Sequence, residues 1–149
     1  MSVRYLEDIQ VGDSFESGFV TVSQAEMIEF ARRYDPQPMH TDPVAALSGP
    51  FGGLIASGWH TAAIVMRLIN EAQPLGDTPI IGMSVDSIHW TQPVRPGDTL
   101  RAHVEAISVR ASRSRPGHGI IKLRVTARNQ RGETVMVQEP SCWMPRRPS

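Results

Sequence analysis

Apolar residues recur at two different spacings along this chain, and the change of spacing divides the chain in two. Residues 59–72 carry apolar side chains at helical spacing, and only Arg67, Asn70 and Glu71 are clearly polar beyond the first turn. From Thr78 onward, apolar and polar residues alternate, which is typical of strands with one buried face. The pattern therefore predicts one long helix followed by an antiparallel sheet.

The helix predicted over residues 59–72 has almost no polar face. Such a helix has to be covered nearly all round, so we expect it at the centre of the fold. Long strands wrapped around one apolar helix make an α+β layer architecture. The chain has no internal repeat and no linker-like segment, and its 149 residues are the size of one ordinary domain. We therefore expect a single domain over residues 1–149.

Turn-forming residues separate the expected strands. Each turn contains glycine, proline or asparagine, which favour the backbone angles of tight turns. Three such turns follow one another along the chain: Arg95-Pro96-Gly97-Asp98, Arg115-Pro116-Gly117 and Asn129-Gln130-Arg131-Gly132.

Two shorter helices are expected before the long one. Ser23 and Glu26 have the spacing of a capping box, in which the serine hydroxyl accepts a hydrogen bond from the backbone of the first turn. The helix that begins there should end at Asp35, because the residue before a proline is pushed out of the helical region. A second, short helix should run from Pro43 to Leu47, with Asp42 as its cap.

The segment between these two helices carries the candidate chemistry. Asp35 and His40 are five residues apart, and Pro36 and Pro38 should keep the segment extended and stiff. A carboxylate and an imidazole that converge on one water molecule can provide general acid–base catalysis. The alternative is structural: Asp35 would cap a turn, and His40 would cap or pack against the next helix.

A glycine-rich stretch from Gly53 to Gly58 leads into the long helix. A helix N-terminus presents unpaired N–H groups and a partial positive charge, which suit a carbonyl oxygen that gains negative charge. The glycines could instead simply allow a buried helix to pack closely. Together with Asp35 and His40, this stretch has the composition of a catalytic site.

The run Tyr34-Asp35-Pro36-Gln37-Pro38-Met39-His40 resembles the hydratase-2 motif of MaoC-like dehydratases and (R)-specific enoyl-CoA hydratases. Segments 54–58 and 92–98 match two further family segments in order and spacing, and the resemblance extends from about residue 11 to 145. It implies a hot-dog fold: a long central apolar helix wrapped by a highly curved antiparallel sheet. It also implies a homodimer or a higher homo-oligomer.

The resemblance also implies a reaction. Asp35 and His40 match the acid–base pair of the family, and Gly58 matches the glycine whose N–H holds the thioester carbonyl. The reaction is the reversible hydration of a trans-2-enoyl thioester to a 3-hydroxyacyl thioester. Coenzyme A enters as part of the acyl-CoA substrate, and neither a metal nor another cofactor is expected.

Three further residues are expected to contact the substrate: Gln37, Ser57 and Trp59. Gln37 and Ser57 depart from the usual family pattern, and Trp59 could either narrow the acyl pocket or belong to the core. A non-catalytic acyl-thioester-binding protein of the same fold is one alternative. An acyl-CoA thioesterase is another, although its family places an acid in or near the central helix, and here the first is Glu71.

The charges cancel in total but not along the chain. Fifteen Lys and Arg residues balance fifteen Asp and Glu residues, which argues against a nucleic-acid or membrane-surface binder. Residues 1–94, however, carry 4 basic and 11 acidic residues, whereas residues 95–149 carry 11 basic and 4 acidic residues. The C-terminal part, residues 95–149, is therefore basic. The densest cluster of basic residues there is Arg110, Arg113 and Arg115. These arginines could bind the phosphates of coenzyme A, or they could simply keep an edge hairpin solvated.

Nothing in the sequence suggests export or a membrane span. The first residues lack the apolar core of a secretory signal, and no apolar stretch approaches the roughly 18–20 residues needed to cross a bilayer. The single cysteine, Cys142, offers neither an internal disulfide nor metal-site spacing, and we expect it to be buried. The sequence therefore predicts a cytoplasmic protein.

Overall fold

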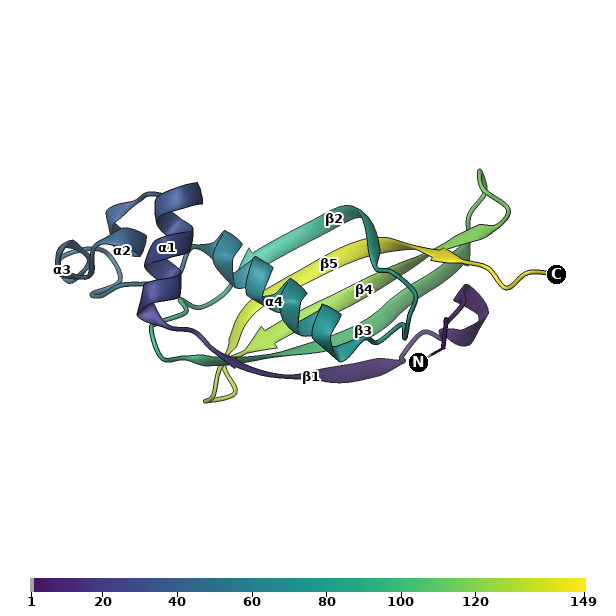
Figure 1. The fold of residues 1–149 in the computed structure, drawn as a ribbon, viewed down its shortest axis with the longest axis horizontal. Helices are drawn as coiled ribbons and strands as arrows, with labels where there is room; N and C mark the ends of the chain where they lie inside the picture. Colours follow the sequence, from purple (N-terminus) through teal and green to yellow (C-terminus); the bar gives the residue numbers. More distant parts are fainter. Residues whose placement is uncertain (1) are drawn as a thin grey trace.

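The computed structural model of the protein describes residues 2–149. Five antiparallel strands form one sheet in the order β1-β3-β4-β5-β2 (Figure 1). Strands β3, β4 and β5 follow one another in the sequence and are joined by short hairpin loops (residues 112–117 and 129–133), whereas β1 and β2 form the two edges. The strands run over Ser14–Thr21 (β1), Ile81–Trp90 (β2), Thr99–Ala111 (β3), His118–Arg128 (β4) and Thr134–Pro145 (β5).

The predicted long helix, α4 (Gly58–Ala72), lies along one face of this sheet (Figure 1). Its Val65 packs in one cluster with the inward-facing residues of β3, among them Leu100 and Val104. Burying each such side chain contributes about 1.5–3 kcal/mol, so this layer supplies much of the stability of the fold. Cys142 is buried in a second, smaller cluster, as expected.

The expectation that α4 is covered all round is wrong for the isolated chain. Trp59 is 60% exposed and Met66 is 44% exposed. The reason is that the sheet covers only one side of the helix. The outer residues of edge strand β2 (Ile81, Met83 and Val85) are themselves open to solvent.

Strand β1 did not emerge from the hydrophobic pattern. Its apolar alternation is interrupted at Ser17 and Gly18, and its register with β3 shifts between Glu16 and Phe19. The buried Ser17 hydroxyl accepts a hydrogen bond from the Ala102 N–H at 2.8 Å, so a polar residue occupies an inward position. A bulge therefore hid this strand from a search for strict alternation. A 3-10 turn (η1, Leu6–Asp8) precedes it.

Three short helices gather at one end of the molecule (Figure 1). Helix α1 (Gln24–Tyr34) begins as predicted, because the Ser23 hydroxyl accepts from the Glu26 N–H at 3.2 Å. Helix α3 (Pro43–Ala46) is capped by Asp42, also as predicted.

The prediction that the segment between these two helices is non-helical is wrong in part. Pro38–Thr41 forms one helical turn, α2, with Pro38 at its first position. Proline is tolerated there because its missing N–H would have had no partner within the helix.

Candidate active site

Asp35 and His40 come together in the structure. Asp35 caps the end of α1, where its N–H donates to the Ala31 carbonyl at 2.8 Å. His40 belongs to the next turn, α2, and its Nε2 lies 3.3 Å from Oδ2 of Asp35. The histidine side chain is only 5% exposed and the aspartate is partly open to solvent. One acidic and one basic group thus meet at the edge of the protein interior.

The ring of His40 is held in one orientation by the backbone. Its Nδ1 lies 2.8 Å from the Ile55 carbonyl oxygen, which can only accept, so Nδ1 carries a hydrogen. The Ile55 N–H in turn donates to the Met39 carbonyl at 3.0 Å, which fixes the two segments together. In the neutral ring, the lone pair of Nε2 therefore faces Asp35.

Two residues that depart from the family pattern both bind the Asp35 carboxylate. The Gln37 side-chain amide donates to Oδ1 at 2.7 Å, and the Ser57 hydroxyl donates to Oδ2 at 2.8 Å. The hydrogen bond from Gln37 is the largest cause that lowers the pKa of Asp35. The Ser57 hydrogen bond and the charge that His40 carries when protonated lower it further, against the opposing effect of burial. Asp35 is therefore kept ionised, with both of its oxygens engaged.

Gly58 lies at the start of α4, and a tryptophan from β2 packs against it. The Trp90 Nε1–H donates to the Gly58 carbonyl at 2.8 Å. A Cβ atom added to Gly58 would lie 2.5 Å from Cε2 of Trp90, which is too close for any real contact. The position therefore requires glycine. The Gly58 N–H belongs to the first turn of α4, so it has no partner within the helix.

These residues line one cavity of about 390 Å³. Asp35, His40 and Gly58 are among its lining residues, and Trp59 lies on its wall, in edge-to-face contact with Trp90 at 5.1 Å between ring centroids. Gln37 and Ser57, which were expected to contact the substrate, do not line this cavity; they bind the Asp35 carboxylate, which does. The other lining residues are mostly apolar: Met39, Phe51, Ile55, Ala56, Thr61, Thr91, Gln92, Pro93 and Val94.

Sequence reasoning missed Trp90 and Phe51 as cavity residues. Trp90 is the last residue of β2, and Phe51 lies in the loop between α3 and α4. No local spacing signals their role, because they reach the cavity through the pairing of β2 in the sheet and the path of the 47–57 loop.

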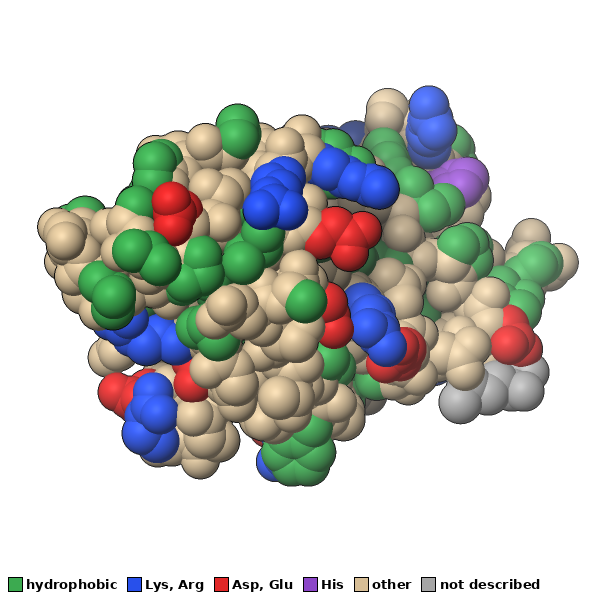
Figure 2. Space-filling view, turned by 60° about the vertical axis from the view of Figure 1, so that its left-hand side comes forward, with side chains coloured by type: hydrophobic (Ala, Val, Ile, Leu, Met, Phe, Trp, Pro, Cys, Tyr) green, Lys and Arg blue, Asp and Glu red, His purple; other side chains and the backbone are tan. Residues whose placement is uncertain are grey.

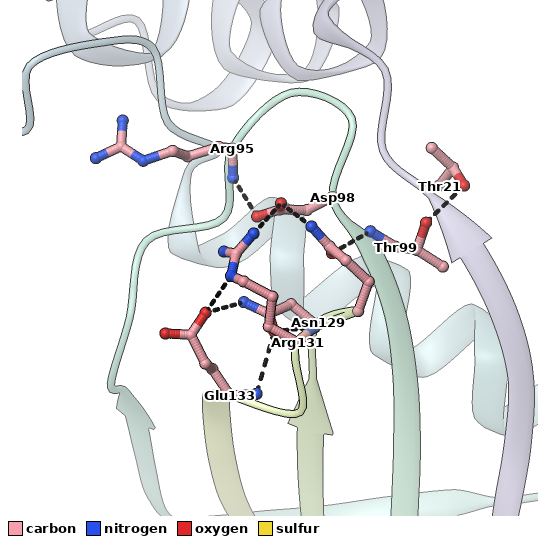
Figure 3. A network of polar contacts seen from close by, with 8 residues as sticks. Thr21, Arg95, Asp98, Thr99, Asn129, Arg131 and Glu133 are labelled. Carbon is pink, nitrogen blue, oxygen red and sulfur yellow. Dashed lines mark hydrogen bonds and ion pairs between the residues drawn. The ribbon is translucent and has the colours of Figure 1, made fainter.

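Residues 91–94 form one wall of the cavity, and the turn that follows them is held by the buried carboxylate of Asp98 (Figure 3). Asp98 accepts from the Arg95 N–H and from the Gln130 side chain, each at 2.9 Å. Within this wall, the Val94 carbonyl accepts from the Ala56 N–H at 2.8 Å, next to the start of α4. The turn predicted at 95–98 thus positions part of the cavity.

The structure does not bring the predicted basic cluster to this cavity. Strand pairing places Arg110 beside the Ile81 end of the sheet, whereas Trp90 lies at the other end of β2. Nine residues of strand separate those ends, or roughly 30 Å. Figure 1 likewise shows the β3–β4 hairpin, with Arg113 and Arg115, at the end of the sheet away from α1–α3. The cluster therefore does not contact the cavity of its own chain.

Residues 2–149 contain neither a cluster of metal-ligating side chains nor a helix that could span a membrane. No group of three or more His, Cys, Asp or Glu side chains could hold a metal ion in that part of the chain. None of the helices described there is long and apolar enough to cross a membrane.

Fold and site together define the class of protein. A five-stranded antiparallel sheet with one long helix along its face is a hot-dog fold of the α+β class. The chain belongs to the MaoC-like domain family, whose model matches residues 8–129.

Relatives of known sequence or structure agree with this assignment. "Uncharacterized protein YdeM" of Bacillus subtilis is 33% identical over 136 residues, or 91% of this chain and 95% of that protein. The crystal structure of a MaoC-like dehydratase from Rhodospirillum rubrum is 42% identical, with a TM-score of 0.91 over 97% of this chain and 99% of the other. "3-hydroxyacyl-thioester dehydratase Z" of Mycobacterium tuberculosis is 32% identical over 63% of this chain, which spans 64% of that protein.

Proposed function

We propose that this protein is a hydro-lyase that reversibly hydrates a trans-2-enoyl thioester, such as an enoyl-CoA, to a 3-hydroxyacyl thioester. The observation that carries the proposal is the 3.3 Å approach of His40 Nε2 to an Asp35 carboxylate, inside a cavity that also holds Gly58. The similarity to a 3-hydroxyacyl-thioester dehydratase supports the same class of substrate.

The pair has the geometry to hold and activate water. When the His40 ring is neutral, Asp35 Oδ2 and His40 Nε2 are both hydrogen-bond acceptors, and they face the same cavity. A water molecule that donates one hydrogen to each would keep its oxygen lone pairs free to attack the β-carbon. As the C–O bond forms, the pair takes one proton from the water and returns a proton to the α-carbon, so the atoms balance.

The start of α4 supports the other half of the reaction. When water adds to the β-carbon, negative charge moves onto the thioester oxygen. The Gly58 N–H and the positive end of α4 would stabilise that enolate. Such fixed donors are commonly among the largest contributors to catalysis. In this proposal no metal ion and no redox cofactor takes part.

A spectrophotometric assay tests the proposal. Purified protein should remove the ultraviolet absorbance of conjugated enoyl-CoA substrates, tested as a panel of short, medium and branched acyl chains. Binding of these thioesters without turnover would identify the alternative, an acyl-thioester-binding protein. Release of free coenzyme A thiol would identify a thioesterase. Complete inertness toward the whole panel would refute the proposal.

We also propose that two copies of the chain pair through β2. This edge strand exposes Ile81, Met83 and Val85, beside an apolar groove of about 250 Å³ that Met66 of α4 also lines. An uncovered apolar edge strand invites pairing with another strand. A two-fold axis perpendicular to the sheet would join the two edges as antiparallel neighbours and would cover the open side of α4.

A further inference from the structure

A second cavity opens on the opposite face of the sheet from α4. Its volume is about 380 Å³, and within residues 2–149 it shares no lining residue with the cavity that holds Asp35 and His40. We call it the outer cavity. Its lining includes Glu16 and Phe19 of β1, Arg101 and His103 of β3, Arg128 of β4, and Gln130 of the β4–β5 turn.

Two arginines face each other directly across the floor of the outer cavity. Arg101 and Arg128 are paired in the register of β3 and β4, so their side chains leave the sheet on the same face. Like charges at directly opposite positions destabilise a sheet. Such a pair is therefore unfavourable unless something of opposite charge lies between the two side chains.

Within the described residues, no carboxylate forms an ion pair with either arginine. Glu16 is the acidic residue that lines the cavity, and its carboxylate is engaged with His103 at 2.7 Å. Arg101 instead lies 4.0 Å above the ring of Phe19. The positive charge of both guanidinium groups thus remains available to a ligand.

The surroundings of the two arginines are held in place by the network around Asp98 (Figure 3). The Gln130 side chain accepts from the Thr99 N–H and donates to the buried Asp98 carboxylate, each at 2.9 Å. At the opposite rim, Phe19 is 66% exposed. The outer cavity therefore combines a wall held by hydrogen bonds, two guanidinium groups and a solvent-exposed aromatic ring.

We propose that the outer cavity binds a phosphate group, with Arg101 and Arg128 as its two cationic ligands. Guanidinium groups match the geometry of phosphate oxygens and can donate two hydrogen bonds each. A bound dianion would also neutralise the repulsion between the two arginines. This proposal is independent of the reaction in the α4 cavity.

Calorimetric titration of the full chain with inorganic phosphate, at low ionic strength, tests the site. Wild-type protein should bind phosphate and show a higher Tm in its presence. Arg128→Ala and Arg101→Ala should each weaken binding about tenfold or more, since hydrogen bonds to charged groups are strong. The matched control is Arg124→Ala, because Arg124 lies on the same face of β4 but is already paired with Glu139 at 3.2 Å. This control should bind like the wild type.

A second readout uses the apo protein. In phosphate-free buffer, Arg128→Ala should unfold at the same Tm as the wild type or a higher one, because one of the two like charges is gone. A merely structural arginine would give a lower Tm. Absence of phosphate binding to wild-type protein at millimolar concentration would overturn the proposal, and so would equal binding by the wild type and both arginine variants.

Titration with adenosine monophosphate separates the two sources of phosphate. Tighter binding than inorganic phosphate, with the gain lost in Phe19→Ala, would support the site with a nucleotide as its ligand. Equal affinity would support it with the phosphate group alone as the recognised feature. Adenosine monophosphate that binds Arg128→Ala as well as it binds wild type would overturn the assignment to this cavity.

Discussion

Asp35 is the residue on which the candidate site converges. It ends α1, and its side chain reaches residues from two other segments, His40 on α2 and Ser57 just before α4. Gln37 completes the set from the same loop. The carboxylate therefore links three segments of the backbone and also faces the cavity. Its charge and its hydrogen bonds can be tested by separate substitutions.

Removing the charge should remove the activity. Asp35→Asn replaces a carboxylate oxygen by an NH₂ group, which leaves either Gln37 or Ser57 without its acceptor. We expect the rate of enoyl-CoA hydration to fall by about 10²- to 10⁴-fold, as for other general acid–base residues. The control is Asp42→Asn in the nearby α3 cap, which keeps a capping oxygen and should keep the rate. Unchanged turnover of Asp35→Asn, measured by the same assay, would contradict the role.

The pH profile should report the Gln37 hydrogen bond. In the proposed mechanism Asp35 acts in its ionised form, so activity should be present above its pKa and should be lost as the pH falls through it. Gln37 is the largest cause of the lowered pKa. Gln37→Ala should therefore raise that pKa and move the acidic limb of the kcat/KM profile to higher pH. Gln37→Asn, which keeps a side-chain amide, should shift the limb less. If the acidic limbs of wild type and Gln37→Ala coincide, the proposed role of the Gln37 hydrogen bond is contradicted.

The glycine at position 58 should be required because of Trp90. Gly58→Ala places a methyl group against the indole ring, and such overpacking costs about 1–3 kcal/mol. In a Trp90→Ala background the same change should cost much less in free energy of unfolding, measured by urea denaturation. Gly18→Ala is the control, because an added Cβ there meets no atom within 4 Å. Equal costs in both backgrounds would show that Trp90 is not the obstacle.

At the scale of elements, α4 connects the core to the site. Its middle is buried against the sheet, while its first turn faces the cavity and packs against α1. There His60 stacks on Phe30, with 4.7 Å between ring centroids. His60 is buried, and its Nδ1 has no hydrogen-bond partner within the described residues. Burial lowers the pKa of His60, against a smaller opposing effect from Glu26.

This buried histidine should make the fold less stable in acid. The unfolded chain binds a proton at the ordinary histidine pKa of about 6.5, whereas folded His60 resists it, so the free energy of unfolding falls as the pH drops below that value. His60→Phe keeps the ring stack and removes the titrating group. The variant should therefore lose less stability than the wild type between about pH 7 and pH 5. Urea denaturation across this range measures the difference, and parallel curves would contradict the prediction.

At the scale of the whole molecule, the acidic and basic parts of the chain pair with each other. Lys122 of β4 binds Asp86 of β2 at 2.6 Å, and Arg146 near the C-terminus binds Glu7 of the first turn at 3.3 Å. On the face shown in Figure 2, charged side chains of both signs are interspersed with hydrophobic ones. Exposed pairs of this kind are worth about 0–1 kcal/mol each, so they distribute charge more than they stabilise the fold.

The proposed dimer gives a prediction at the same scale. Val85→Asp places a charge in the exposed apolar stretch of β2. Wild-type protein should sediment as a dimer and the variant as a monomer, because the pairing would bury an unpartnered carboxylate. Val11→Asp, at an exposed site outside the sheet, should leave the dimer intact. A monomeric wild-type protein, or a dimeric Val85→Asp, would contradict pairing through this edge.

Local patterns in the sequence were enough to predict the long helix, the strands after Thr78 and the cap at Ser23. Each depends on the spacing of apolar residues or on a hydrogen bond within a few positions. Strand β1 and the helical turn at Pro38 were missed. A bulge interrupts the apolar alternation of β1. In the helical turn, Pro38 occupies the first position, where a helix tolerates proline.

By itself, the sequence determined the core helix of this protein, most of its strands, and the short segment that carries Asp35 and His40, because these follow from neighbours along the chain. Tertiary structure alone decided that Ser57 binds Asp35, that Trp90 packs on Gly58, and that the Arg110 cluster lies at the far end of the sheet. The same holds for the pairing of Arg101 with Arg128. These contacts join residues tens of positions apart, and only strand register and helix packing bring such residues together.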